Sequence, residues 1–295
     1  MSHPDNTTPF TVATRLGPLH VATIGSGPPA LLWHSLFVDS TTWSRLHTAM
    51  AAERRLVLVD GPNHGGNTPV RHPFTLDDCV GVAVDVLDEL GIAEPVDWLG
   101  NAWGGHVGVL FAAAHAERCR TLTAIGAPIH ALSDADRRRT RLLSLLYRAG
   151  GPRLVAGLLV EALLGPGARA NDPDGAAIVA DAFGRAERRG MYDAIRWLSL
   201  GRRDLTPVLD RLDTPTLLTT GPDDPMWTTA AARDAAAHLR TGALAILPGA
   251  GHVGPLLQAA PDVTELVTAF WREPDRTIAT QRRAVTSPRR PGTPG

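Results

Sequence analysis

The sequence contains no lysine, because all 29 of its basic side chains are arginine. A lysine Schiff base and the lysine of a phosphate-binding P-loop are therefore excluded. Cysteine is also scarce: Cys79 and Cys119 lie far apart, each in an apolar stretch. This usage indicates neither a disulfide framework nor a cysteine metal site. We expect no metal and no cofactor.

An excess of charge of one sign and long apolar runs are also missing. The 29 basic and 30 acidic side chains give a net charge of -1, which offers no electrostatic case for nucleic acid or an anionic membrane as partner. The longest apolar run, 154–164, is too short to span a bilayer and contains Glu161. Residues 1–8 lack the apolar core of a signal peptide. We expect a cytoplasmic protein with a small-molecule substrate.

What is present is an alternation of strand-like and helix-like segments in 295 residues, of which 44% are hydrophobic. Two short β-rich runs on either side of Gly17 and Pro18 predict a hairpin. Continuous apolar runs at 30–33 and 56–59 are typical of strands buried on both faces. Further strands are predicted at 96–99, 121–125, 216–220 and 243–247. Helical patterns lie between them, at 41–52, 75–90, 106–115, 228–239 and 263–271. The alternation predicts an α/β fold, a mostly parallel sheet with helices on both faces.

The alternation breaks in the middle of the chain. Residues 134–205 show several helical patterns and no convincing strand, which predicts an inserted helical cap over about 130–205. The last residues, 273–295, are rich in Pro, Arg, Thr and Gly. We therefore expect one domain over 10–272, with a disordered N-terminus at 1–9 and a disordered tail at 273–295.

A glycine-rich turn carries the first chemical signal. Residues 100–105 (GNAWGG) follow an apolar strand and open an apolar helix, which is the context of the nucleophile elbow G-x-S-x-G. Such a turn can instead hold a phosphate at the helix N-terminus. The Rossmann spacing G-x-G-x-x-G is absent, however, as is the P-loop lysine.

Two polar residues follow later strands. Asp224 lies in the segment GPDD and His252 in the segment GAGH. Taken singly, each is best explained as a turn or capping residue. With position 102 they give the chain order nucleophile, acid, base, and each follows a strand, where α/β sheets bind ligands. Asp223 is the fallback acid.

The segment 33–37 (WHSLF) also follows a strand. A loop at this place supplies one backbone N–H of an oxyanion hole, here that of Leu36. The residue after the nucleophile position, Trp103, supplies the other. We assign substrate-binding roles to His34, Ser35, Phe37 and Asn101, although structural roles are favoured for Ser35 and Asn101.

Together these segments resemble the α/β-hydrolase superfamily over about residues 10–272. The resemblance includes 60–65 (DGPNHG), which is similar to the D-x-x-G-x-G loop of many members. The segment 96–100 (VDWLG) and the short cap are most similar to enol-lactone hydrolases and C–C bond hydrolases. The resemblance implies the α/β-hydrolase fold, with His252 as base and Asp224 orienting it.

Two positions depart from the family pattern. Ser35 stands where the family usually has glycine, and Ala102 stands where it has serine, cysteine or aspartate. A methyl group cannot attack a carbonyl, so covalent catalysis at this position is impossible. Either the nucleophile has been removed from this variant, or the chain is a natural divergent member.

These residues predict an enzyme acting on a small, largely apolar carbonyl compound, namely an ester, a lactone or a vinylogous diketone. We expect the apolar face of the cap to contact the acyl or ring portion; this face contains Leu142, Leu143, Leu146, Val155, Leu158, Leu159 and Leu163. Two alternatives are open. One is a non-covalent lyase or isomerase that uses His252 and Asp224. The other is a catalytically inactive homologue that binds a ligand.

Overall fold

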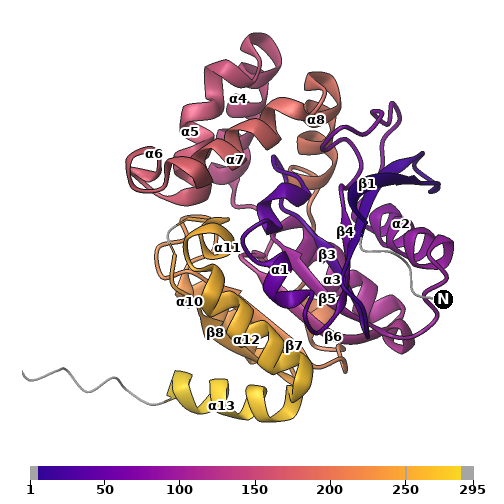
Figure 1. Cartoon of the computed structure of the whole chain (residues 1–295). Helices are drawn as coiled ribbons and strands as arrows, with labels where there is room; N and C mark the ends of the chain where they lie inside the picture. The colour runs from indigo at the N-terminus through magenta and orange to yellow at the C-terminus, as the bar shows by residue number, and fades with distance from the viewer. Residues whose placement is uncertain (1–5, 250, 287–295) are drawn as a thin grey trace, which may run out of the picture.

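The computed structural model describes residues 6–249 and 251–286. Its centre is an eight-stranded sheet in the order β1-β2-β4-β3-β5-β6-β7-β8 (Figure 1). The strands are β1 Asn6–Val12, β2 Leu19–Ile24, β3 Pro29–Trp33, β4 Arg55–Val59, β5 Val96–Asn101, β6 Cys119–Ile125, β7 Thr216–Thr220 and β8 Gly242–Ile246. The pairs β1–β2 and β2–β4 are antiparallel, and the other pairs are parallel. The predicted α/β class and mostly parallel sheet are confirmed.

The strands bury both of their faces, as their continuous apolar runs predict. Along β3, Leu31 and Trp33 belong to one core, whereas Ala30 and Leu32 belong to the core on the other face. Helices α2 Leu76–Glu89, α3 Trp103–Ala114 and α10 Thr229–Ala237 cover the first face. Helices α1 His47–Met50, α11 Gly254–Gln258 and α12 Ala260–Arg272 cover the second. Short 3-10 turns complete these layers at η1 Ser40–Trp43 and η2 Ala116–Arg118.

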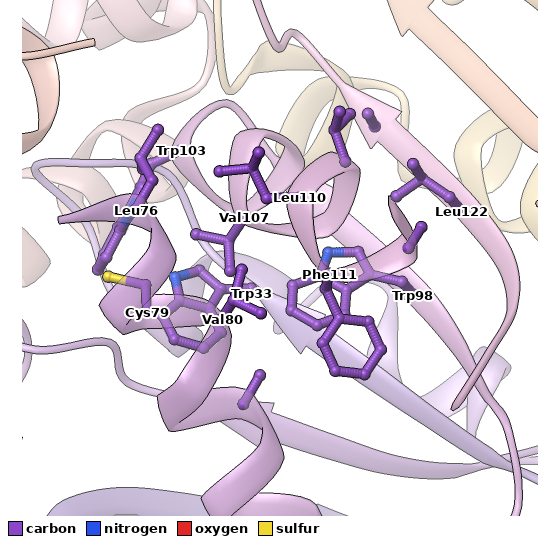
Figure 2. Close-up of a cluster of buried hydrophobic side chains, with 14 of the residues drawn as sticks. Trp33, Leu76, Cys79, Val80, Trp98, Trp103, Val107, Leu110, Phe111 and Leu122 are labelled. Atoms are coloured by element: carbon purple, nitrogen blue, oxygen red, sulfur yellow. The ribbon is translucent and has the colours of Figure 1, made fainter. Parts of the chain in front are cut away.

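Three tryptophans organise the first core, beside the turn at position 102 (Figure 2). The rings of Trp33 and Trp98 are stacked with centroids 6.1 Å apart, and Trp103 meets Trp33 edge-on at 5.4 Å. The indole N–H of Trp98 donates to the carbonyl of Gly104 at 2.9 Å. Because aromatic side chains bury large apolar areas, this cluster fixes the strand-to-helix turn between β5 and α3.

Between β6 and β7 the chain forms only helices, here called the cap segment (134–199). They are α4 Asp134–Gly150, α5 Pro152–Leu164, α6 Ala168–Asn171, α7 Pro173–Arg185, α8 Arg188–Ala194 and the π-helix η3 Ile195–Ser199, and α9 Thr206–Leu209 follows them. Two bidentate ion pairs join the cap segment to the region after β3. Arg185 binds Asp39, and Arg45 binds Asp172. The α7 side of the cap segment is thereby held against the sheet domain.

Both ends of the chain are more ordered than the composition predicts. The expectation of disorder at 1–9 is wrong for 6–9, because β1 begins at Asn6 and pairs with β2. The expectation of a disordered tail is wrong over α13 Pro274–Thr286. Ile278 of α13 is buried against β7, β8 and α12. Arg282 of the same helix donates to the carbonyl of Gly242 at 2.8 Å, so both residues anchor α13 beside β8. Residues 1–5 and 287–295 lie outside the described part of the chain.

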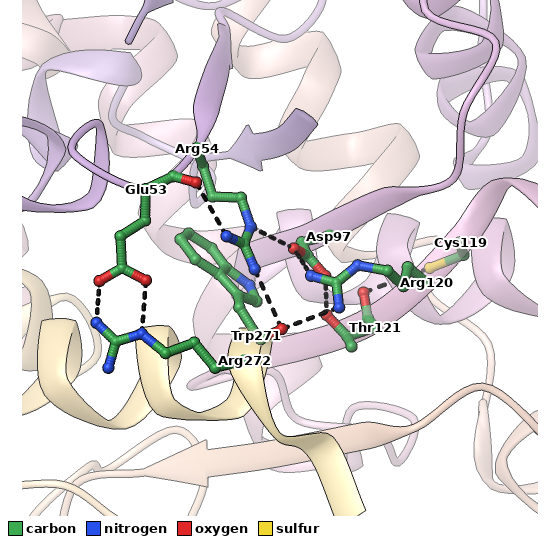
Figure 3. Close-up of polar contacts among 8 residues, drawn as sticks. All are labelled: Glu53, Arg54, Asp97, Cys119, Arg120, Thr121, Trp271 and Arg272. Carbon is green, nitrogen blue, oxygen red and sulfur yellow. Dashed lines mark hydrogen bonds and ion pairs between the residues drawn. The ribbon is translucent and has the colours of Figure 1, made fainter. Parts of the chain in front are cut away.

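A buried carboxylate holds the amino end of the central strands together (Figure 3). Asp97 of β5 is fully buried and accepts hydrogen bonds from Arg54 at 2.8 Å, from Arg120 and from the Thr121 hydroxyl at 2.6 Å. Both arginines also donate to the carbonyl of Trp271 in α12. The cluster lies at the opposite end of β5 from Ala102, so its role is structural.

In the described part of the chain, no helix is long and apolar enough to cross a membrane.

Candidate active site

Ala102 lies in the sharp turn between β5 and α3, as the glycine pattern predicts. Its φ of 48° and ψ of -105° are strained for a residue with a Cβ. The N–H of Ala102 donates to the carbonyl of Ile125 at 2.8 Å. A Cβ at Gly104 would collide with the backbone of Trp33, so only glycine allows α3 to start this close to β3. The turn has the geometry of a nucleophile elbow but carries a methyl group.

Asp224 and His252 form a buried pair. The imidazole Nδ1 of His252 lies 2.9 Å from Oδ2 of Asp224, and both residues are at most 5% exposed. The other oxygen of Asp224 accepts the backbone N–H of Met226 at 2.8 Å, which fixes the carboxylate. Asp223, the fallback acid, is exposed, whereas Asp224 makes the contact with the imidazole. In the described chain, Nε2 of His252 has no hydrogen-bond partner, which leaves it available as a base.

Asn101 links the turn to the histidine loop. Its side-chain Nδ2 donates to the carbonyl of Ile125 at 2.9 Å and to the carbonyl of His252 at 3.2 Å. The residue is fully buried. Asn101 therefore brings position 102 and His252 together through their backbones. Both amide hydrogens are used inside the chain, which gives Asn101 a positioning contact, whereas its Oδ1 has no hydrogen-bond partner among the described residues.

Two backbone N–H groups, those of Leu36 and Trp103, are the candidates for an oxyanion hole. Neither the N–H of Leu36 nor that of Trp103 donates a hydrogen bond within the described residues. The segments that carry them are joined, because the N–H of Gly104 donates to the carbonyl of His34 at 3.2 Å. Trp103 also opens α3, whose N-terminal end favours negative charge. The arrangement suits an oxyanion hole.

Two neutral histidines shape the loop that carries Leu36. Nδ1 of His34 lies 2.7 Å from the carbonyl of Ser35, and its Nε2 accepts the N–H of Gly61 at 2.9 Å. Nδ1 of His64 lies 2.8 Å from the carbonyl of Pro62, and its Nε2 accepts the N–H of Phe37 at 3.3 Å. Burial lowers the pKa of His34. Burial also lowers the pKa of His64, to about 3, and the neighbouring His34 adds to this effect. Both ring nitrogens of each histidine are therefore engaged within the chain. One of these two histidines is His34, the predicted substrate contact.

The remaining predicted contacts differ in where they point. Ser35 is buried, and its hydroxyl makes no hydrogen bond among the described residues. Phe37 has a φ of 75°, and its ring meets that of Phe183 in α7 with centroids 6.2 Å apart. His106 of α3 places Nε2 2.9 Å from the carbonyl of Pro128, and burial holds its pKa well below the ordinary value. Of these residues, Phe37 connects the loop with the cap segment.

The end of α5 lies directly on the histidine loop. The N–H of Val253 donates to the carbonyl of Leu163 at 2.7 Å. The predicted apolar lining is only partly correct, because Leu163 is buried here but Leu142, Leu146 and Leu158 are 40–61% exposed. A helical period shows that these leucines share a face, but it cannot show which way that face points.

Two cavities of about 450 and 540 Å³ lie away from the pair of Asp224 and His252. One is between α4 and α8, and the other is between β8, α12 and α13. Neither is lined by Ala102, Asp224 or His252, which are 3–5% exposed. Among the described residues, no group of three or more His, Cys, Asp or Glu side chains is placed to hold a metal ion.

Comparison with known proteins identifies the family. The model of the alpha/beta hydrolase family matches residues 30–266. The chain belongs to this family. The enol-lactonase from Burkholderia xenovorans LB400 has a similar structure, with a TM-score of 0.82 and 22% identity over 90% of this chain and all of that one. A thermophilic esterase from Thermogutta terrifontis superposes with a TM-score of 0.80 and 22% identity over 91% of this chain and all of that one. At this identity the two structures support the fold alone.

Two curated proteins are similar to this chain in sequence. The dihydrolipoyllysine-residue acetyltransferase component of the acetoin cleaving system of Pseudomonas putida is 27% identical over 84% of this chain and 64% of its own length. The 2-hydroxy-6-oxononadienedioate/2-hydroxy-6-oxononatrienedioate hydrolase of Cupriavidus pinatubonensis is 38% identical over 35% of this chain and 33% of its own length. The chain therefore spans less than two thirds of the length of these relatives.

Proposed function

We propose that this chain hydrolyses a small, largely apolar ester or lactone by general-base catalysis, without an acyl-enzyme. The observation that carries the proposal is the buried pair of Asp224 and His252, with Nε2 of His252 unpartnered among the described residues. A chain that only binds a ligand has no need of an oriented base. The methyl group of Ala102 removes the nucleophile, and the space of the missing oxygen suits a water molecule.

The reaction then needs one water molecule. Nε2 of His252 takes a proton from water while the water oxygen bonds to the substrate carbonyl carbon. The carbonyl oxygen becomes an oxyanion, which accepts hydrogen bonds from the N–H groups of Leu36 and Trp103. When the intermediate collapses, the bond to the leaving oxygen breaks and His252 returns the proton to that oxygen. Ester and water give acid and alcohol, and Asp224 stabilises the imidazolium throughout.

The relatives support a carbonyl substrate in a general way. The similar proteins include an enol-lactonase, an esterase and a hydrolase of oxo-dienedioates. The same pair can also remove a proton next to a carbonyl, with the enolate held by the two N–H groups. That chemistry is a lyase or isomerase reaction. It is the second candidate function, because it uses the same base and the same oxyanion site.

The test compares turnover of short-chain nitrophenyl esters and small lactones by the native chain and by His252→Gln. We expect kcat to fall at least about 100-fold, since a positioned base contributes this much. The control is His238→Gln, because His238 lies 2.9 Å from Asp210 in an exposed pair of the same geometry. Equal turnover by His252→Gln and the native chain would reject the proposal.

A second measurement separates the covalent route. Intact mass spectrometry during turnover should show the unmodified chain, because no acyl group is attached at position 102. An acyl adduct on Ser35 would transfer the nucleophile to the loop of Leu36 and overturn the water mechanism. Proton exchange from the substrate without hydrolysis would favour the lyase or isomerase reaction.

A further inference from the structure

The outer side of the cap segment carries an unusual number of exposed leucines. Seven large hydrophobic side chains are exposed among the described residues, and five of them lie on α4 and α5. These five, here called the leucine face, are Leu142, Leu145, Leu146, Leu154 and Leu158, each 40–61% exposed. Figure 1 shows α4 at the end of the cap segment away from the sheet, and Leu154 and Leu158 lie in the first half of α5, before the end that packs on the histidine loop. The leucine face is therefore not part of the catalytic site.

The spacing of the leucines places them on one side of each helix. On α4, Leu142 and Leu145 are three residues apart and Leu146 follows, whereas Ser144 and Tyr147 are buried on the opposite side. On α5, Leu154 and Leu158 are four residues apart. The two helices are joined at Gly151 and pack on each other. The result is an amphipathic helical hairpin whose apolar side points outward.

Arginines flank the leucine face, and their charges are not neutralised. Residues 134–164 contain six arginines against three carboxylates, although the whole chain has a net charge of -1. The six are Arg137, Arg138, Arg139, Arg141, Arg148 and Arg153. None of them forms a salt bridge within the described residues. Elsewhere arginines are commonly paired, for example Arg15 with Asp85 and Arg185 with Asp39. The overall charge balance thus conceals a local positive surface.

A cavity with two arginines adjoins the leucine face. It has a volume of about 450 Å³ and lies between α4, α8 and the end of η3. Arg141 and Arg196 line it, together with Tyr192. Leu145 belongs both to this cavity and to the leucine face. A phosphate in the cavity would meet two guanidinium groups while its apolar chains lie along the leucines.

We propose that the leucine face docks the protein on an anionic lipid surface, with lipid phosphates at Arg141 and Arg196. An apolar helix side bordered by arginines fits the boundary between headgroups and acyl chains. A second copy fits less well, because a two-fold contact through this face sets the same arginines against each other. Protein interfaces also favour aromatic residues at their centre, whereas this face is formed by leucines.

The experiment is sedimentation of the full chain with lipid vesicles. We expect binding to vesicles of phosphatidylcholine mixed with phosphatidylglycerol, weaker binding at high salt, and little binding to phosphatidylcholine alone. The double change Leu142→Ser and Leu146→Ser should weaken binding at least about tenfold. Ile246→Ser is the control, because Ile246 is equally exposed on β8, away from the cap segment.

A charge variant tests the second part of the surface. Arg138→Gln with Arg141→Gln should weaken binding to anionic vesicles and reduce its dependence on salt, whereas Arg233→Gln on α10 should change neither. Equal binding to both kinds of vesicle, or unchanged binding by the leucine variant, would reject the proposal. Dimers that form without lipid and disappear in the leucine variant would assign the face to a second copy instead. Vesicle binding is measured without substrate, so it succeeds or fails independently of the proposed reaction.

Discussion

The side-chain amide of Asn101 donates a hydrogen bond to the backbone carbonyl of His252 at 3.2 Å, across 151 positions of the chain. It also donates to the carbonyl of Ile125. The carboxyl ends of β5 and β6 and the histidine loop after β8 are therefore fastened at one buried amide. Because His252 owes its position to this contact as well as to Asp224, Asn101 should affect catalysis without touching substrate.

Asn101→Asp tests this relationship. The carboxylate keeps the shape of the side chain but has no hydrogen to donate, and it brings oxygen atoms against two carbonyl oxygens. We expect kcat to fall while KM changes little, and the free energy of unfolding to fall by about 1–3 kcal/mol. Steady-state kinetics and urea unfolding measure the two effects. Asn171→Asp, at an exposed position of α6, is the control. An unchanged kcat would show that the histidine loop holds its position without the amide.

Ala102→Ser tests what the methyl group replaces. The backbone already has the strained angles of the elbow, so adding one oxygen requires no change in the turn. We expect the variant to react covalently with a fluorophosphonate and the native chain not to react. Ester hydrolysis should rise at least about 100-fold if the remaining triad is intact, since a triad member is worth more than this in serine hydrolases.

The control for this gain is Ala102→Ser combined with His252→Gln, which lacks the base that activates the serine. Labelling of the double variant as fast as the single variant would mean that the serine reacts without His252. Labelling by mass spectrometry distinguishes the two possibilities left open by the sequence. A large gain points to simple loss of the nucleophile, and no gain points to a pocket that has diverged.

The sequence predicts the central strands well where they are buried on both faces and apolar throughout, as at 30–33. It also predicts the pairing of Asp224 with His252, because both follow strands at the same edge. It fails where the order or exposure of a helix is decided by packing between distant segments. Ile278 anchors a helix in a segment expected to be disordered, and the leucines of α4 point outward. The positioning role of Asn101 was missed because two backbone carbonyls, and no side chain, receive its hydrogen bonds.

Asp97→Asn tests the buried cluster of Figure 3. The carboxylate is fully buried and binds Arg54 and Arg120, so the neutral amide leaves buried guanidinium charge without its counter-charge. We expect the free energy of unfolding to fall by about 3–5 kcal/mol, measured by urea unfolding. Asp88→Asn is the control, because the carboxylate of Asp88 is 60% exposed in its pair with Arg118. That change should cost at most about 1 kcal/mol, and equal losses in both variants would contradict the buried-charge argument.

The buried histidines predict how stability depends on pH. Burial lowers the pKa of His34, His64 and His106, that of His64 to about 3 from an ordinary 6.5. Below pH 6.5 the unfolded chain therefore binds protons that the folded chain does not bind. The free energy of unfolding has its full value above that pH and decreases as the pH falls toward 3. His64 contributes a slope of about 1.4 kcal/mol per pH unit in this window, and His34 and His106 add to it in the same direction.

His64→Gln measures one of these contributions. Glutamine can accept the N–H of Phe37 but binds no proton near neutral pH, so its unfolding free energy should change less with pH than that of the native chain. Between about pH 7 and 5 the difference should amount to about 2 kcal/mol, read from urea unfolding at each pH. His238→Gln is the control because His238 lies at the surface beside Asp210. Since the two replacements remove the same kind of side chain, equal pH profiles for both would mean that His64 takes up its proton in the folded chain and that burial does not keep it neutral.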